Sequence, residues 1–252
     1  MGNRIYIIIP LLALSALLIY SSINEYNYLK SLRTARKIME NMSKGNPTPE
    51  EYGEGFEKAL AELNAARKAI PERAETSLYL GKLYQNFILA PFEYRYAVAE
   101  KNGITEESAL RLSVEFLERA VSLNPRDPET HLTLAWIYNY LEKPMDADQE
   151  IFLAEKYSPN KLSTLSKLLE WSIWRRDLNK AEKLSIQIYL IHPGQLNSVL
   201  NIVWRGYQDY EVLKKFVPEN AKSRVVLVRF LKSKGMADAA RAEEEYARTL
   251  VE

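Results

Sequence analysis

The sequence predicts an all-α protein, in which an N-terminal transmembrane helix precedes an α-solenoid of about four to five helical hairpins. Two observations predict this fold. An apolar run occupies residues 5–20, and proline and alanine recur at a constant interval along the later chain. The chain has no cysteine, which excludes a disulfide framework, a thiolate zinc site and an iron–sulfur cluster. With 252 residues and 47% hydrophobic content, it can form one substantial folded body.

The first residues predict a transmembrane signal anchor over residues 1–23. The apolar run begins at Ile5 and ends at Tyr20, and the residues up to Ile23 extend it weakly. A helix of that length would span roughly 28 Å, close to the thickness of a hydrocarbon core. Tyrosines stand near both ends, where aromatic rings favour the membrane interface. We therefore expect membrane contact through residues 5–23.

Two alternatives for the N-terminus stay open. A cleaved secretory signal shares the short basic start and apolar core, but no clean small-residue cleavage site follows the run. Myristoylation of Gly2 would favour serine or threonine at position 6, which is tyrosine. The anchor predicts a single-pass protein of the inner (cytoplasmic) membrane. The order of a short basic start, an apolar core and a large following domain resembles a secretory signal, and it favours an exported, periplasmic body. By the positive-inside rule, the cations that follow the span would instead keep the body in the cytoplasm.

A repeat of 34 residues organises the later chain. Pro125, Pro159 and Pro193 are spaced by 34 residues, and Ala147 and Ala181 keep the same interval. A period of this length is typical of a helix–turn–helix unit that cannot bury its apolar face alone. Neighbouring units of this kind stack on one another.

The residues in phase with this period resemble those of the tetratricopeptide-repeat (TPR) family, of the membrane-anchored bacterial type. The clearest copy, residues 128–161, carries Leu134, Ala135 and Tyr138 where the family has a leucine, a small residue and a tyrosine. His131 stands at the family's tryptophan position, and we expect it to be a packed, hydrogen-bonded histidine. Further in-phase matches are Ala59, Leu63, Ala66, Pro71, Leu80, Gly81, Tyr84, Leu165, Leu168, Ala240 and Ala247.

The resemblance implies three segments. Residues 1–23 form the anchor, residues 24–48 a helical juxtamembrane linker, and residues 49–252 a TPR-like superhelical domain. The spacing indicates an insertion of about twenty residues near 85–105, between the two helices of one unit.

The resemblance also implies where partners bind, because TPR domains bind peptides or protein surfaces along the groove lined by the first helix of each unit. Only Lys82 and Lys167 among the groove positions are cationic, so a clamp for a free carboxylate is not expected. Aromatic rings occupy the groove instead, and Trp and Tyr are enriched in binding hot spots. The predicted partner-binding residues are Trp136, Tyr140, Trp174 and Trp204 in the groove, and Tyr94, Arg95 and Tyr96 in the insertion.

The alternative is that these rings fill the core. It is the favoured interpretation for Trp204, and also for Phe87 and Phe92 of the insertion. For Trp136 and Trp174 both interpretations stay open.

Composition and motifs indicate a protein without catalytic activity. The formal net charge of +1 gives no basic excess for binding nucleic acid. The sequence has two histidines, and it lacks a glycine-rich phosphate loop, a nucleophile elbow and a zinc-protease motif. We expect no cofactor, no metal and no small-molecule substrate. The acidic run Glu243-Glu244-Glu245 is interpreted as a solvated helix face.

The sequence therefore predicts a membrane-anchored scaffold or adaptor that binds other proteins, either membrane-complex subunits or peptide segments. Such a protein would help to assemble or stabilise a membrane-associated complex. The alternative is a membrane-tethered chaperone that binds exported or nascent polypeptides transiently.

Overall fold

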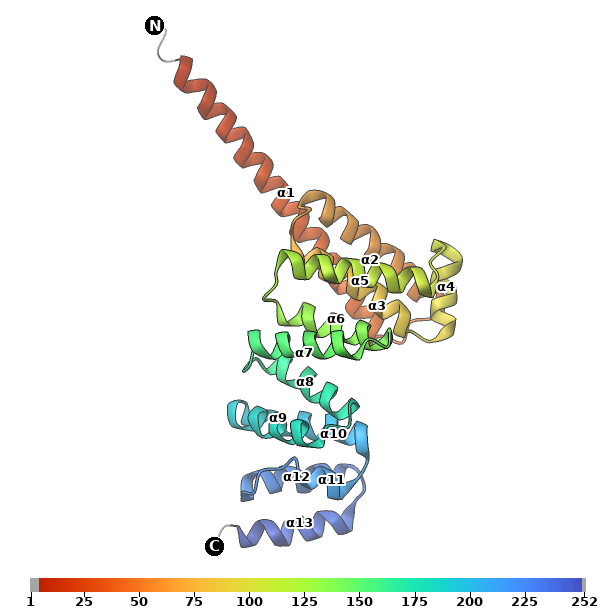
Figure 1. Ribbon diagram of the computed structural model, residues 1–252, viewed down its shortest axis with the longest axis vertical. Helices are drawn as coiled ribbons and strands as arrows, with labels where there is room; N and C mark the ends of the chain where they lie inside the picture. Colours follow the sequence, from red (N-terminus) through yellow and green to blue (C-terminus); the bar gives the residue numbers. More distant parts are fainter. Residues whose placement is uncertain (1–4, 251–252) are drawn as a thin grey trace. The chain divides into compact units, whose positions relative to one another are not determined.

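The structure, a computed structural model, describes residues 5–250, and it describes side chains from residue 14 onward. The described chain is helical, with short connecting segments (Figure 1). It divides into two compact units, of which unit 1 extends to Ala147 and unit 2 begins at Asp148. The helices are α1 (Ile5–Lys44), α2 (Pro49–Ala69), α3 (Ala74–Leu89), α4 (Phe92–Asn102), α5 (Glu106–Leu123), α6 (Pro128–Tyr140), α7 (Pro144–Tyr157), α8 (Leu162–Trp174), α9 (Leu178–Ile191), the 3₁₀ helix η2 (Pro193–Gln195), α10 (Leu196–Tyr207), α11 (Tyr210–Lys214), α12 (Ala221–Ser233) and α13 (Ala237–Thr249).

The predicted transmembrane helix is wrong. Among the residues that the structure describes, no helix contains an apolar stretch long enough to cross a membrane. From residue 14, where the described side chains begin, the apolar stretch is short, because it meets the polar residues Ser21, Ser22 and Asn24. Residues 1–4 of the predicted anchor, and the side chains of residues 5–13, lie outside what the structure describes. The predicted fold class is therefore wrong in its transmembrane helix, and the predicted inner-membrane localisation with a periplasmic body is wrong with it.

In unit 1, α1 pairs with α2 to form a helical hairpin (Figure 1). Tyr28, Leu32, Ala35 and Met39 recur every three or four residues of α1, and all four are buried in the core of this unit. A capping box at Thr48 starts α2 directly after the loop. The segment predicted as a linker thus carries a helix face that packs into the core, which the sequence analysis did not anticipate.

The second hairpin of unit 1 is formed by α3 and α5. Gly81 sits at their closest approach, because a Cβ there would lie 2.5 Å from Leu117 Cγ. Ser113 Oγ donates a hydrogen bond of 2.9 Å to the Gly81 carbonyl across the same contact. Between these helices the chain forms α4, which packs against α2. The small residue of the repeat pattern is therefore required here by the distance between two helices.

Unit 2 repeats the hairpin arrangement, with α8 paired to α9 and α12 paired to α13. Ala181 of α9 and Ala240 of α13, both in phase with the 34-residue repeat, are 0% exposed. Small side chains at these positions allow the paired helices to approach closely. The same arrangement is seen at Ala66 and Ala120 in unit 1, which are also 0% exposed.

A buried charge network joins α11, α12 and α13. Arg224 Nη1 lies 3.1 Å from Glu243 Oε2, and the two side chains are only 6% and 3% exposed. The Tyr210 hydroxyl donates a hydrogen bond of 2.7 Å to Glu243 Oε1, and the Arg224 guanidinium lies over the Tyr246 ring. The prediction that Glu243 belongs to a solvated face is wrong, because this carboxylate is the buried acceptor of the network.

The turns that follow α6, α8, α10 and α12 contain residues in the left-handed region of backbone conformation. The φ angle is 57° at Glu142, 59° at Arg176, 49° at Gln208 and 75° at Gly235. Only glycine adopts such angles without a steric cost, which is roughly 1–2 kcal/mol for other residues. Arg176 also donates a hydrogen bond of 3.2 Å to the Gly206 carbonyl, which helps to hold its turn.

Candidate functional site

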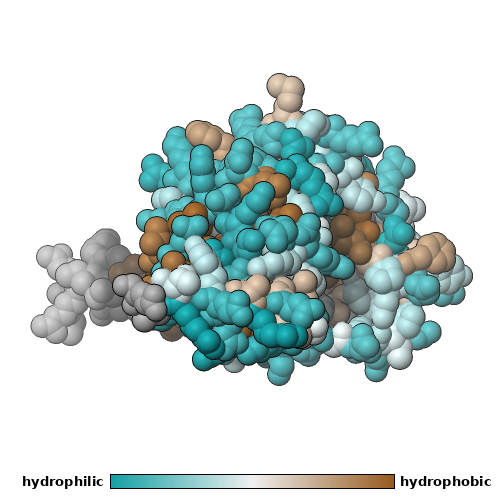
Figure 2. All heavy atoms as spheres, turned by 90° about the horizontal axis from the view of Figure 1, so that it is seen from below, coloured by the Kyte–Doolittle hydropathy of each residue, from teal (hydrophilic) through white to brown (hydrophobic). Residues whose placement is uncertain are grey.

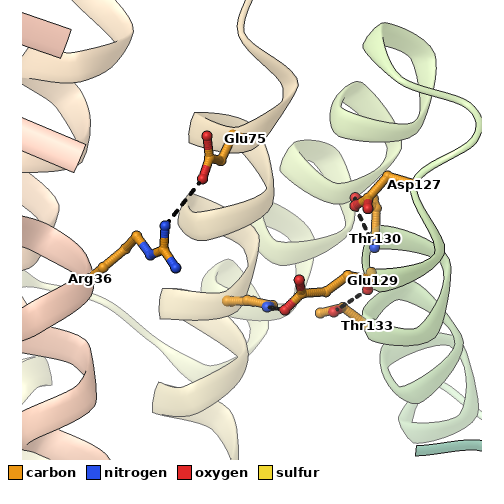
Figure 3. A network of polar contacts seen from close by, with 7 residues as sticks. Arg36, Glu75, Asp127, Glu129, Thr130 and Thr133 are labelled. Atoms are coloured by element: carbon orange, nitrogen blue, oxygen red, sulfur yellow. Dashed lines mark hydrogen bonds and ion pairs between the residues drawn. The ribbon is translucent and has the colours of Figure 1, made fainter. Parts of the chain in front are cut away.

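A ladder of polar side chains connects three helices of unit 1 (Figure 3). Arg36 of α1 pairs with Glu75 of α3, with 3.5 Å between Nη1 and Oε1. Lys82, two turns further along α3, pairs with Glu129 of α6. Glu75, Tyr79 and Lys82 share one face of α3, since they are spaced by four and three residues. The ladder therefore marks a continuous surface that crosses α1, α3 and α6.

Tyr79 lies between the two cations of this ladder. The centroid of its ring is 5.2 Å from the Arg36 guanidinium carbon and 5.3 Å from Lys82 Nζ. Both distances are within the range of a cation–π contact. The ring is half-buried, and burial is the main reason that the pKa of its hydroxyl is raised above the ordinary value. The hydroxyl is therefore neutral at physiological pH and can donate a hydrogen bond.

The start of α6 holds Glu129 in place. The Asp127 carboxylate caps the helix by accepting a hydrogen bond of 2.9 Å from the Thr130 amide, and the Thr133 hydroxyl donates one of 2.7 Å to the Glu129 carbonyl (Figure 3). A small cavity of about 250 Å³ lies between the starts of α3 and α6, with Glu75, Tyr79 and Glu129 in its lining. The surface thus has fixed polar groups around a shallow recess.

Two predicted partner-binding residues, Trp136 and Tyr140, lie on the same face of α6 as Glu129 and Thr133. The four residues are spaced by four, three and four positions, which keeps them on one side of a helix. Trp136 is partly buried and Tyr140 is 44% exposed. We name the set of Arg36, Glu75, Tyr79, Lys82, Glu129, Thr133, Trp136 and Tyr140 the first-helix surface.

The structure brings Tyr140 and Arg95 to a common partner, although the sequence places them in different segments. The Tyr140 hydroxyl donates a hydrogen bond of 2.5 Å to Glu106, and Arg95 forms an ion pair with the same carboxylate. The hydrogen bond to Glu106 is the main cause that raises the pKa of Tyr140. Arg95 is thus engaged inside unit 1, where it ties α4 to the start of α5.

The two other predicted residues of the insertion differ in their surroundings. Tyr94 packs edge-on against the Tyr52 ring at 5.1 Å, and its hydroxyl donates a hydrogen bond of 3.0 Å to the Pro47 carbonyl. Tyr96 is 59% exposed and lies 6.3 Å from the ring of Phe92, which is 69% exposed. The core interpretation is therefore confirmed for Phe87, which is 2% exposed, and wrong for Phe92.

Exposed hydrophobic side chains occur at several places on the protein. Figure 2 shows a face on which hydrophilic residues predominate and hydrophobic residues gather in separate patches. In unit 1, Phe92 and Tyr96 stand near a cavity of about 360 Å³ at the end of α3, whose lining includes Leu89, Pro91 and Tyr94. This apolar corner is distinct from the first-helix surface, which is polar and aromatic.

Trp174 and Trp204 lie in unit 2. Trp174 is 49% exposed, with its ring 5.5 Å from the ring of buried Trp171. Trp204 is partly buried and packs edge-on against Phe230 at 6.1 Å. Trp174 accordingly offers the larger contact surface of the two.

A mixed cavity of about 430 Å³ is also found in unit 2. Its lining includes Phe152 and two ion pairs, Arg175 with Asp148 at 3.1 Å and Lys180 with Glu155 at 2.9 Å. Each cation of the lining is therefore already matched by a carboxylate. Over residues 5–250, no group of three or more His, Asp or Glu is arranged to hold a metal ion.

Of the first-helix surface, only Trp136 and Tyr140 were among the predicted partner-binding residues, and the ion-pairing residues Arg36, Glu75 and Glu129 were not identified from the sequence. The spacing of Glu75, Tyr79 and Lys82 on one helix face was the available signal. The role of Arg36 had no such signal, because its partner Glu75 lies on another helix, 39 residues further along the chain. His131 agrees with its prediction, since it is 1% exposed with Nε2 3.0 Å from the Pro125 carbonyl oxygen.

Comparison with known proteins gives a likeness in fold only. No protein-family model matches the sequence, and no curated protein matches it. The structure is similar to that of MamA protein at a TM-score of 0.45 and 16% identity, over 82% of this chain and 96% of that one. It is similar to YrrB, a TPR protein with an unusual peptide-binding site, at a TM-score of 0.42 and 14% identity, over 83% of this chain and 96% of that one.

A third similar structure is TTC0263, a thermophilic TPR protein in Thermus thermophilus, at a TM-score of 0.45 and 15% identity, over 69% of this chain and 96% of that one. These solved structures of similar fold thus include TPR proteins. Likeness at this level carries no argument about function. The residue spacing and the hairpins described above are what relate this chain to the TPR fold.

Proposed function

We propose that the protein is a scaffold that binds another protein across the first-helix surface of unit 1 and so brings it into a larger assembly. The observation that carries this proposal is the ladder of Arg36, Tyr79 and Lys82, which spans helices that are far apart in the sequence. A surface built from successive hairpins offers a partner a contact area much longer than one helix.

The chemistry of the surface suits a protein partner. Tyr, Trp and Arg are the residues that most often dominate binding energy at protein interfaces. Here Tyr79 and Tyr140 present aromatic rings, while Arg36 and Lys82 supply cations whose positions are fixed by carboxylates. Pairing within the ladder reduces the entropy that these side chains would lose on binding. The recess of about 250 Å³ is too small for most drug-sized ligands, which supports a surface contact over a small-molecule site.

The experiment is affinity purification of the tagged full-length chain under mild conditions, followed by mass spectrometry. The variants Tyr79→Ala and Lys82→Glu change the centre of the ladder. Leu190→Ala is the control, because Leu190 is an exposed apolar residue (71%) on α9 in unit 2. Circular dichroism melting confirms that each variant is folded.

We expect wild type and Leu190→Ala to recover the same partner in fixed stoichiometry. Both ladder variants should reduce its recovery by about tenfold or more, the loss typical of a hot-spot residue. Equal recovery by a folded Tyr79→Ala protein would reject the surface. Recovery of many proteins without fixed stoichiometry would reject the assembly role.

A further inference from the structure

One face of α1 carries an exposed row of side chains that continues along the helix. Ile19, Ile23, Tyr26, Lys30, Arg33 and Lys37 follow one another at intervals of three or four residues. Because an α-helix turns by about 100° per residue, this row lies opposite the buried residues Tyr28, Leu32, Ala35 and Met39. We name these six residues the α1 stripe.

The stripe has an apolar half and a cationic half. Ile19, Ile23 and Tyr26 are 61%, 52% and 65% exposed, so a connected apolar patch faces solvent. One or two turns later, Lys30 and Lys37 are also exposed, with Arg33 between them. Exposed apolar patches of this kind are typical of sites where another molecule binds.

The cations of the stripe are not neutralised by their own helix. The two acidic residues of α1 are engaged elsewhere, since Glu25 pairs with Arg73 at 2.9 Å and Glu40 pairs with Lys44. Within residues 14–250, Lys30, Arg33 and Lys37 form no ion pair. Arg36, three residues after Arg33, already belongs to the first-helix surface, so the stripe borders that surface.

A second copy of the chain is a poor occupant of this face. If two copies of α1 were parallel, the cationic halves would face each other, and like charges in contact repel. If they were antiparallel, the cationic half of each copy would lie on the apolar half of the other. Neither arrangement matches both halves of the stripe.

We propose that the α1 stripe binds an amphipathic helix of a partner protein that carries apolar residues in one half and carboxylates in the other. This inference rests on the proposed function, and it names the chemistry of the partner at the edge of the first-helix surface. The apolar half of the partner covers Ile19, Ile23 and Tyr26, and its carboxylates pair with Lys30, Arg33 and Lys37. A helix laid along this face would be recognised by anchors at heptad spacing.

The test uses the full-length chain and a synthetic helical peptide with leucines at heptad positions in one half and glutamates in the other. Binding is measured by fluorescence anisotropy. The variant Lys30→Glu/Arg33→Glu/Lys37→Glu reverses the charge of the stripe. The matched control, Lys183→Glu/Lys222→Glu/Arg229→Glu, makes the same change of net charge at exposed cations of unit 2.

We expect the stripe variant to weaken peptide binding by about tenfold or more and the control by less than about threefold. A peptide with lysines in place of the glutamates should bind the stripe variant better than wild type. This reciprocal rescue depends on charge pairing at the stripe, and a general loss of stability would not produce it. The double variant Ile23→Ser/Tyr26→Ser should also weaken binding of the acidic peptide, because this variant removes two of the three apolar side chains of the stripe.

Three results would overturn the proposal. The first is that the acidic peptide does not bind the wild-type protein. The second is that both triple variants weaken peptide binding equally. The third is that the protein binds equimolar phosphatidylserine–phosphatidylcholine vesicles but does not bind the peptide. Failure of the peptide test leaves the proposed function standing if Tyr79→Ala and Lys82→Glu still reduce partner recovery by about tenfold or more. If partner recovery does not depend on Tyr79 and Lys82, the proposed function itself is rejected.

Discussion

Each unit contains an arginine that meets a glutamate on a neighbouring helix, but the two pairs lie in opposite surroundings. The Arg36–Glu75 pair of unit 1 spans 3.5 Å with side chains 55% and 46% exposed. The Arg224–Glu243 pair of unit 2 spans 3.1 Å with side chains 6% and 3% exposed. Water screens the first pair, so breaking it changes stability little and its charges remain accessible to a partner. The second pair has lost its water, so each charge depends on the other.

The same contrast extends to the polar groups that each unit buries. In the described part of unit 1, the buried polar residues are threonines, serines and His131, and none is Asp, Glu, Lys or Arg. Tyr52 adds a buried hydroxyl that donates a hydrogen bond of 3.2 Å to the Asn86 carbonyl. Unit 2 instead buries a full charge pair. The comparison teaches that charge in unit 1 is kept at the surface, where it can serve binding, whereas in unit 2 it fixes the last helices.

The largest effect is expected for Glu243→Gln, which leaves Arg224 charged and buried without its counterion. We expect the free energy of unfolding to fall by about 3–5 kcal/mol in urea denaturation. The double variant Arg224→Met/Glu243→Leu removes both charges and should be far closer to wild type than the single variant. A loss below about 1 kcal/mol for Glu243→Gln would break the comparison.

Two tyrosines that donate to glutamates sharpen the comparison. The Tyr210 hydroxyl is 2.7 Å from buried Glu243, while the Tyr140 hydroxyl is 2.5 Å from Glu106 at the surface. Burial and the bond to Glu243 raise the pKa of Tyr210, so its hydroxyl remains a donor well into alkaline pH. Tyr210→Phe should cost about 2 kcal/mol of unfolding free energy, and Tyr140→Phe less than about 0.5 kcal/mol. Equal losses in urea denaturation would contradict this prediction.

Alkaline pH tests the neutral interior of unit 1. Burial raises the pKa of Tyr52 to about 12, whereas an unfolded tyrosine ionises near its ordinary value of 10.0. The stabilisation is therefore fully present below pH 10 and is lost between about pH 10 and 12, because the unfolded state releases the proton first. At a pH one unit above 10.0 the loss should be about 1.4 kcal/mol.

Tyr52→Phe isolates this contribution, because the other tyrosines titrate in both proteins. Urea denaturation at pH 9 and pH 11 should give a smaller decrease of unfolding free energy for the variant than for wild type. An identical decrease in the two proteins would show that Tyr52 ionises as an exposed tyrosine does.

The smallest effect is expected for Glu75→Gln, which breaks the exposed pair of unit 1. Its cost should be no more than about 0.5 kcal/mol, and it should vanish in about 0.5 M salt. Thermal melts of wild type and variant at low and high salt measure this difference. A salt-independent cost above about 2 kcal/mol would place this pair in the same class as Arg224–Glu243.

The helical repeat could be predicted because its residues repeat for one physical reason. Gly81, Ala181 and Ala240 stand where paired helices approach closely, and each is recognisable from its spacing alone. The first hairpin was missed, since the buried face of α1 follows an apolar run that resembles a membrane span. There the composition of the first residues outweighed the spacing of Tyr28, Leu32, Ala35 and Met39.

The candidate site was only partly predictable. Spacing placed Trp136 and Tyr140 on one face of a helix, but pairing across helices depends on distances that no sequence window contains. Glu106 shows this well, because it accepts from both Tyr140 and Arg95 although these residues lie 45 positions apart. The prediction for Glu243 was wrong for the same reason, because its neighbours Glu244 and Glu245 give this segment the composition of a solvated helix face.

The left-handed turns after the first helices leave this protein short of the stability its fold permits. Glu142 and Gln208 adopt positive φ angles, as Gly235 does, although their side chains disfavour that conformation. Evolution can thus raise the thermal tolerance of the chain by single replacements with glycine, without altering either charge pair or the α1 stripe. These turns are positions at which the protein can gain thermal stability while the residues of the first-helix surface stay unchanged.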